Sequence, residues 1–156
     1  MQEIKSSVDI DASAAMVWAI LTDFASYRRW NPFIRAIAGK PAARSRLTLT
    51  LQCQGRQPLS TRCTLTRVRE PRELSWRRHR IVPAFLSSEH RFRIESLAAG
   101  GVRFHHSEQI NGLLASLLGR GWLRATEQDF HAMNHALKTR AERVEANLAD
   151  AGQKTS

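Results

Sequence analysis

A chain of 156 residues has the length of one domain, and its 42% hydrophobic and 24% charged residues can build a core rather than a disordered chain. It has no run of about 18 apolar residues, so a membrane-spanning helix is excluded. The N-terminus lacks the apolar region of a signal peptide, and we expect a cytoplasmic protein with one domain over residues 1–150 and a disordered tail over 151–156.

The positive charge is the main compositional signal. A formal net charge of +10 arises from 24 basic and 14 acidic residues, and 20 of the basic residues are arginine. No zinc-finger, helix-turn-helix or aromatic RNA-binding motif accompanies it, so we expect no specific nucleic acid. Two interpretations stay open: a solvated arginine coat, or weak contact with an anionic surface. The second would use arginines on the outer face of a sheet, namely Arg62, Arg77, Arg91, Arg93 and Arg103.

The first thirty residues predict a strand, a helix and a short helical turn. Residues 3–11 alternate in polarity, which is typical of a strand. Ser13 offers an N-cap for a helix over residues 14–24, whose apolar side chains have helical spacing. A second helical turn covers residues 26–30 and ends before Pro32, because proline disfavours helix at the residue that precedes it.

From residue 33 to residue 110 the hydrophobic period changes to two, which is typical of antiparallel strands. Loops over residues 55–60, 82–87 and 98–101 separate neighbouring strands. The expected strands cover residues 34–38, 46–54, 61–69, 73–81, 88–97 and 102–110.

Residues 119–149 form the longest helical pattern, with one apolar stripe from Trp122 to Leu148 and no proline. At 1.5 Å per residue this helix is roughly 45 Å long, and only the sheet can cover it. We therefore predict an α+β fold in which a curved antiparallel sheet of about six or seven strands wraps one long C-terminal helix, with two short helices after the first strand. A cavity remains wherever the inward side chains fail to meet.

Four segments spread over nearly the whole chain resemble the START-like superfamily, also labelled SRPBCC, which includes birch pollen allergens, polyketide cyclases or dehydratases and lipid-transfer domains. They are residues 4–24 (IKSSVDIDASAAMVWAILTDF), 27–34 (YRRWNPFI), 106–112 (HSEQING) and 130–138 (FHAMNHALK).

The resemblance implies the helix-grip fold and a ligand cavity, but it does not choose between binding, transport and catalysis. No motif transfers a particular enzyme's catalytic residues to this chain. The chain departs from the superfamily at Ala43, Arg44 and Ser45, which stand where a glycine usually precedes the second long strand.

Inward aromatic and apolar side chains are the main candidates for ligand contact. Each could instead fill the core, although residues near the cavity mouth, Phe33, Phe85 and Trp122, are stronger candidates because loops often carry function. The full set of predicted ligand-binding residues is Trp30, Phe33, Trp76, Phe85, Phe92, Phe104, Trp122, Thr126, Phe130 and Met133.

Four polar residues are also predicted to point inward: Arg78, His90, His106 and Glu108. Burying them unpaired would cost several kcal/mol each, so they must pair with one another, reach water or meet a ligand. They are the candidates for acid–base catalysis, since histidine titrates near neutral pH. The alternative is a satisfied ion pair with histidines packed as polar core.

The cysteines and the remaining histidines suggest no metal site or cofactor. Cys53 and Cys63 flank the loop at 55–60 and are expected to be near neighbours across a hairpin, as two thiols in a reducing compartment. His131 and His135 have helical spacing, but they lack the intervening glutamate of a zinc protease helix, and His131 is expected to face solvent.

The leading hypothesis is that the protein binds, and in one version transports, a hydrophobic or amphipathic small molecule between sheet and helix, without a cofactor and as a monomer or homodimer. The first alternative is an enzyme resembling a polyketide cyclase or dehydratase that uses the same cavity. The second is a module that contacts anionic surfaces through the arginine-rich sheet face.

Overall fold

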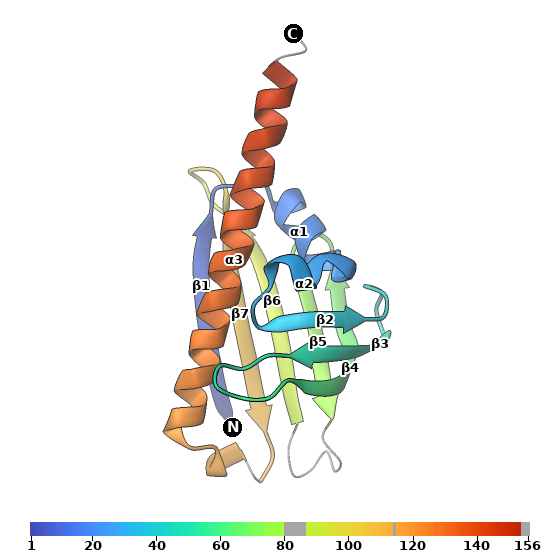
Figure 1. The fold of residues 1–156 in the computed structure, drawn as a ribbon, viewed down its shortest axis with the longest axis vertical. Coiled ribbons are helices and arrows are strands. Elements are labelled where there is room, and N and C mark those ends of the chain that lie inside the picture. The colour runs from blue at the N-terminus through green and yellow to red at the C-terminus, as the bar shows by residue number, and fades with distance from the viewer. Residues whose placement is uncertain (80–86, 114, 154–156) are drawn as a thin grey trace.

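A computed structural model describes residues 1–79, 87–113 and 115–153. One antiparallel sheet of seven strands, in the order β1-β7-β6-β5-β4-β3-β2, curls around a long helix (Figure 1). The strands are β1 (Gln2–Ile10), β2 (Ile34–Ala38), β3 (Arg46–Leu51), β4 (Leu59–Arg69), β5 (Glu73–His79), β6 (Ser87–Ser96) and β7 (Val102–Asn111). The helices are α1 (Ala14–Thr22), α2 (Tyr27–Trp30) and α3 (Arg120–Gln153), with 3-10 turns at η1 (Phe24–Ser26) and η2 (Ala115–Leu117).

The predicted α+β architecture is confirmed, and the differences lie at the ends of elements. The helix α3 continues to Gln153, so residues 151–153 of the predicted tail are helical. Its last turns run past the end of the sheet (Figure 1), which leaves Leu148 of the predicted apolar stripe 59% exposed. The predicted strand end at Ile81 and most of the loop at 82–87 lie outside the described residues.

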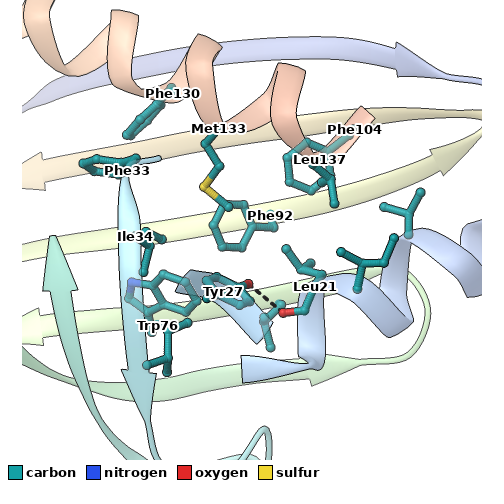
Figure 2. Close-up of a cluster of buried hydrophobic side chains, with 14 of the residues drawn as sticks. Leu21, Tyr27, Phe33, Ile34, Trp76, Phe92, Phe104, Phe130, Met133 and Leu137 are labelled. Atoms are coloured by element: carbon teal, nitrogen blue, oxygen red, sulfur yellow. Dashed lines mark hydrogen bonds between the residues drawn. The ribbon is translucent and has the colours of Figure 1, made fainter. Parts of the chain in front are cut away.

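The alternating strands place their apolar faces against α3. Phe92 of β6, Phe104 of β7 and three consecutive stripe residues of α3 are fully buried in one cluster (Figure 2). Those stripe residues are Phe130, Met133 and Leu137. A helix whose bulky side chains interdigitate with a curved sheet excludes water along its central turns.

The two N-terminal helices close the upper end of this cluster. Ser13 caps α1 by accepting a hydrogen bond from Met16 N–H at 3.2 Å, as the sequence predicts. The buried Tyr27 donates its hydroxyl to the Leu21 carbonyl at 2.6 Å (Figure 2), which satisfies one of the unpaired carbonyls at the end of α1. Desolvation raises the pKa of this tyrosine far above its usual range.

The predicted neighbourhood of the two cysteines is wrong. Cys63 is opposite Leu47 in the β3–β4 ladder, and the last pair before the turn is Leu51 with Leu59. The turn is therefore centred on Gly55, which has a φ of +69°, rather than on the middle of residues 55–60. Cys53 consequently lies in the turn, beyond the end of β3, and both cysteines are free thiols.

Arg44 stands in a conformation that favours glycine. Its φ is +67°, in the left-handed region, and its N–H donates to the Leu65 carbonyl at 2.9 Å. The left-handed conformation crowds the Cβ of an ordinary residue. The backbone at Arg44 is therefore strained, and the hydrogen bond to Leu65 of β4 holds it in this conformation.

We predict that Arg44→Gly raises the free energy of unfolding by about 0.5–1 kcal/mol, because glycine adopts this backbone without strain. Urea unfolding monitored by circular dichroism measures the effect. Arg44→Ala is the matched control, since it removes the same charge but keeps the Cβ. Equal stability of the two variants would contradict the assignment of strain to this residue.

Candidate functional site

A cavity of about 300 Å³ lies between the β3–β4 hairpin, the inward faces of β5 to β7 and the first turns of α3. One part of its wall is apolar, with Phe33, Leu51, Ile110, Leu118 and Trp122. The other part is polar and comes from Arg56, Gln57, Arg78, Ser87, Ser88 and Glu108. Its volume is at the lower end of known ligand pockets, so it suits a small molecule or one end of a longer one.

The cavity exists at this end of α3 because the stripe residue here is small. Further along the helix, Phe130, Met133 and Leu137 fill the concave face of the sheet and are fully buried. One turn before Phe130 the stripe residue is Thr126, whose hydroxyl bonds back to the Trp122 carbonyl at 3.0 Å. A threonine fills less space than a phenylalanine, and Thr126 lines the cavity.

The structure divides the predicted ligand-binding residues into two groups. Phe33, Trp122 and Thr126 line the cavity. The others within the described residues lie in the core beside it, except Trp30, which is half-buried against Tyr27 with a ring-centroid distance of 5.0 Å. Phe85 lies outside the described residues. The core group is Trp76, Phe92, Phe104, Phe130 and Met133.

Arg78 and Glu108 form an ion pair in the polar part of the cavity wall. An Arg78 Nη donates to the Glu108 carboxylate, and its Nε donates to Ser88 Oγ at 3.0 Å. Glu108 is 1% exposed, so without this partner its charge would be buried and uncompensated. Within the part of the chain that the structure describes, the other terminal nitrogen of Arg78 has no protein partner.

The two predicted histidines lie directly behind this ion pair, on β6 and β7. His90 Nδ1 is 3.9 Å from Glu108 Oε2, and His90 Nε2 is 2.7 Å from His106 Nε2. The ring of His90 stacks on Trp76 at 5.1 Å, and that of His106 stacks on Phe130 at 3.7 Å. All four polar residues predicted to point inward therefore meet, although only Arg78 and Glu108 line the cavity.

A hydrogen-bonded chain fixes the proton positions on these rings. His106 Nδ1 donates to the Asn134 amide oxygen at 2.9 Å, and Asn134 in turn donates to Ser6 Oγ at 3.0 Å. His106 Nε2 must then accept from His90 Nε2–H, which leaves His90 Nδ1 unprotonated and facing Glu108. Beyond Ser6, the chain ends at His131 Nδ1 at 3.0 Å, and His131 is exposed as predicted.

Both buried histidines are held neutral. Desolvation is the main cause that lowers the pKa of each well below 6.5. The Arg78 guanidinium lowers the pKa of His90 further, and the neighbouring His90 ring does the same for His106. A neutral pair satisfies every hydrogen bond of the chain, whereas a second proton on either ring would be buried among aromatic side chains.

Sequence reasoning missed the residues that the β3–β4 hairpin and the start of α3 bring to the wall. Cys53 lies in the hairpin, and burial raises the pKa of its thiol, which disfavours the thiolate. Asp129 of α3 accepts from Gln54 N–H at 3.3 Å and thus holds the hairpin over the cavity. Burial raises the pKa of this carboxyl group. No periodic pattern predicts these contacts, because they depend on where a turn folds back.

Other candidate sites offer less. A larger hollow of about 740 Å³ lies mainly on the convex face of the sheet, but charged side chains such as Arg91 and Glu73, 3.4 Å apart, line it and pair with each other. Residues 1–79, 87–113 and 115–153 contain no group of three or more side chains that could hold a metal ion. Nor does any helix among them have the length and apolar character needed to cross a bilayer.

We predict that acid destabilises the protein in the range where the unfolded histidines titrate. Below about pH 6.5 these two histidines bind protons in the unfolded chain but not in the native state. The free energy of unfolding that they contribute is therefore fully present above this pH and decreases as the pH falls below it. The midpoint urea concentration of unfolding should be lower at about pH 5.5 than at about pH 7.5. Carboxylates of ordinary pKa titrate below this range, so the change reports the histidines. His135→Gln, at an exposed position, is the control and should keep this dependence. An unchanged wild-type midpoint would contradict the neutral pair.

Comparison with known proteins agrees with this geometry. Residues 1–142 match the family model "Polyketide cyclase / dehydrase and lipid transport", whereas no curated protein matches the chain. A START superfamily protein from Mycobacterium smegmatis superposes with a TM-score of 0.72 at 22% identity, over 91% of this chain and 98% of that one. The Zhui aromatase/cyclase from Streptomyces sp. R1128 superposes with a TM-score of 0.71 at 17% identity, over 91% and 94%. At these identities the two structures establish the shared fold, and the match over residues 1–142 shows that the chain belongs to the polyketide cyclase, dehydrase and lipid transport family.

Proposed function

We propose that the protein binds a small amphipathic molecule in the cavity at the Arg120 end of α3. The observation that supports this most is that the cavity wall combines apolar side chains with a buried ion pair. Apolar burial contributes roughly 25 cal/mol per Å² to affinity, and the polar groups orient the molecule. The ligand class follows from this wall and from the small volume.

The polar part of the wall favours a ligand with a hydrogen-bond acceptor. Among the described residues, Arg78 keeps one terminal nitrogen for such a group, since its Nε and other Nη are engaged by Ser88 and Glu108. Glu108 offsets the charge of the guanidinium, so a neutral carbonyl or hydroxyl fits better than a strongly anionic group. A flat or branched apolar body would lie against Phe33 and Trp122.

The volume limits how much of a ligand the cavity encloses. About 300 Å³ equals roughly ten water molecules at 30 Å³ each. A complete phospholipid is too large, whereas a small aromatic or short-chain carbonyl compound fits. Native mass spectrometry of gently purified protein is the direct way to identify what it holds.

We predict that Thr126→Trp abolishes binding by filling the cavity. Thr126 lines it and is 7% exposed, so a tryptophan at this position occupies the space of the ligand. Binding of the neutral apolar fluorescent probe N-phenyl-1-naphthylamine should weaken by at least about tenfold, which is about 1.4 kcal/mol.

The matched control for this experiment is Thr139→Trp, the same exchange at an exposed position of the same helix. It should bind the probe as the wild type does, and thermal unfolding of both variants checks that they are folded. Unchanged probe binding by folded Thr126→Trp would overturn the proposed cavity, whatever the natural ligand is.

Catalysis in the same cavity is the second candidate function, and the meeting of Glu108 with His90 favours it. The Glu108 carboxylate lies at the cavity wall with the unprotonated Nδ1 of His90 3.9 Å behind it, so it is placed to accept a proton from a bound carbonyl compound. This arrangement suits dehydration of a polyketide-like substrate, in which Glu108 takes a proton from one carbon, the neighbouring carbon loses its hydroxyl group, and the two combine as water while a double bond forms. Cyclisation uses the same proton removal, after which the carbon attacks a carbonyl group of the same molecule to close the ring.

Glu108→Gln separates the two functions. The amide keeps a hydrogen-bond acceptor for Arg78 and the shape of the side chain, so we predict probe binding within about threefold of wild type. If the protein is an enzyme, its turnover of a linear poly-carbonyl substrate, followed by product analysis, should fall at least about a hundredfold. A variant that turns over substrate as fast as the wild type would exclude Glu108 as the acid–base group.

A further inference from the structure

The net positive charge of the chain is confined to one segment. Residues 24–69 contain ten basic residues and no Asp or Glu, whereas the rest of the chain contains 14 basic and 14 acidic residues. The entire formal charge of +10 therefore comes from this basic segment, residues 24–69. It forms η1, α2, β2, β3 and β4, which is one lateral edge of the sheet (Figure 1).

The charges of the basic segment are exposed and mostly unneutralised. All ten of its lysines and arginines are exposed. Among the ion pairs of the described residues, only one includes a member of the segment, Arg67 with Glu73 at 3.6 Å. Side chains with this exposure attract anions over about the Debye length, roughly 8–10 Å at physiological salt.

The arginines on the convex face of β5 to β7, which the sequence singled out for contact with anions, differ in this respect. Arg77 pairs with Glu89 at 2.9 Å, and Arg103 pairs with Asp9 at 2.7 Å in two parallel hydrogen bonds. Arg91 lies between two glutamates, at 3.4 Å from Glu73 and 3.6 Å from Glu89. Acidic neighbours cancel most of the field of this face.

The basic segment reaches the mouth of the cavity. Arg56, Gln57 and Leu59 of the β3–β4 hairpin line the cavity, and Leu59 is 41% exposed. Next to the cavity-lining Leu118, the side chain of Leu117 is 75% exposed. Exposed leucines beside arginines at the entrance to an apolar cavity are suited to a bilayer interface, where apolar groups enter the acyl boundary and cations meet anionic headgroups.

The composition of this surface favours lipid over nucleic acid. Proteins that bind single strands need exposed aromatic rings on which bases stack. In the basic segment Phe24, Tyr27 and Phe33 are buried, and Trp30 is half-buried against Tyr27. The exposed apolar residues next to the cavity, Leu59 and Leu117, are aliphatic.

We infer that the basic segment docks the protein on an anionic lipid bilayer, with the cavity mouth turned toward the membrane. The inference rests on the proposed function, since a mouth that faces a membrane matters only if the cavity takes an apolar ligand. Each arginine near a membrane of typical negative charge contributes about 1 kcal/mol, so several acting together give reversible binding. The protein then collects or releases its ligand at the membrane surface.

Vesicle cosedimentation tests this inference without knowledge of the ligand. Wild-type protein should partition onto phosphatidylcholine vesicles that contain about 30 mol% phosphatidylserine at low salt, and partition should weaken at least tenfold on going from about 50 to about 300 mM NaCl. Vesicles of phosphatidylcholine alone should bind little. Leu117→Gln should weaken binding to the anionic vesicles by several-fold, because it removes the aliphatic contact.

A pair of variants with equal charge locates the docking surface. Arg28→Gln, Arg29→Gln, Arg46→Gln and Arg62→Gln together should weaken partition at least about tenfold. The same exchange at Arg77, Arg91, Arg93 and Arg103 lowers the net charge of +10 by the same four charges and should weaken it less than about threefold. Circular dichroism verifies that both remain folded.

Three results would overturn the inference: no partition of the wild type at low salt, equal losses in the two variants, or salt-sensitive binding to DNA without binding to vesicles. The probe assay with Thr126→Trp is independent of these results, so failure of membrane docking is distinguishable from failure of the cavity.

Discussion

The structure depends on the packing of α3 into the concave face of the sheet. Phe130, Met133 and Leu137 fill the space that the curled strands leave open, and their full burial makes the centre of the molecule dry. The same helix then determines where the cavity lies, because its stripe changes from bulky residues to Thr126 toward the Arg120 end. The residues along this one helix thus determine that the molecule is densely packed around Phe130, Met133 and Leu137 and has a cavity beside Thr126.

The dry centre also controls the chemistry of the polar residues beside it. Stacking of His90 on Trp76 and of His106 on Phe130 excludes water from both imidazoles and keeps them neutral. The ion pair of Arg78 and Glu108 lies at the boundary between this region and the cavity. A ligand that enters the cavity therefore meets fixed charges and fixed hydrogen-bond donors with little solvent to reorganise.

The fold was predictable from two periodicities, and part of the site was predictable from the same source. Alternation in β6 and β7 placed His90, His106 and Glu108 on the inward face, where the structure has them. Alternation does not reveal whether an inward residue meets a neighbour or a void, because this depends on the volumes of side chains from four or five elements. Trp76 and Phe92 are core for this reason, whereas Thr126, of much smaller volume, borders the cavity.

Turns were the least predictable part of the site. The position of Gly55 sets the register of the β3–β4 hairpin, and a shift of its centre moved Cys53 out of the strand and onto the cavity wall. The location of the net positive charge in residues 24–69 could be predicted from the sequence, but only if the positions of acidic residues are considered together with those of basic residues. Counting arginines alone points to the convex face, where Arg77 and Arg103 are already neutralised.

The strand order has a consequence for how the chain assembles during its synthesis. β1 is the first element of the chain, yet its neighbour in the sheet is β7, and the first residue of β1 pairs with Ile110. Until β7 has left the ribosome, β1 has no strand to pair with, and until α3 follows, the concave apolar face has no cover. Domains dominated by contacts between residues distant in sequence fold slowly, and they expose hydrophobic surface and unpaired strand edges until folding is complete. Chaperone capture of the nascent chain should therefore persist until the last helix emerges.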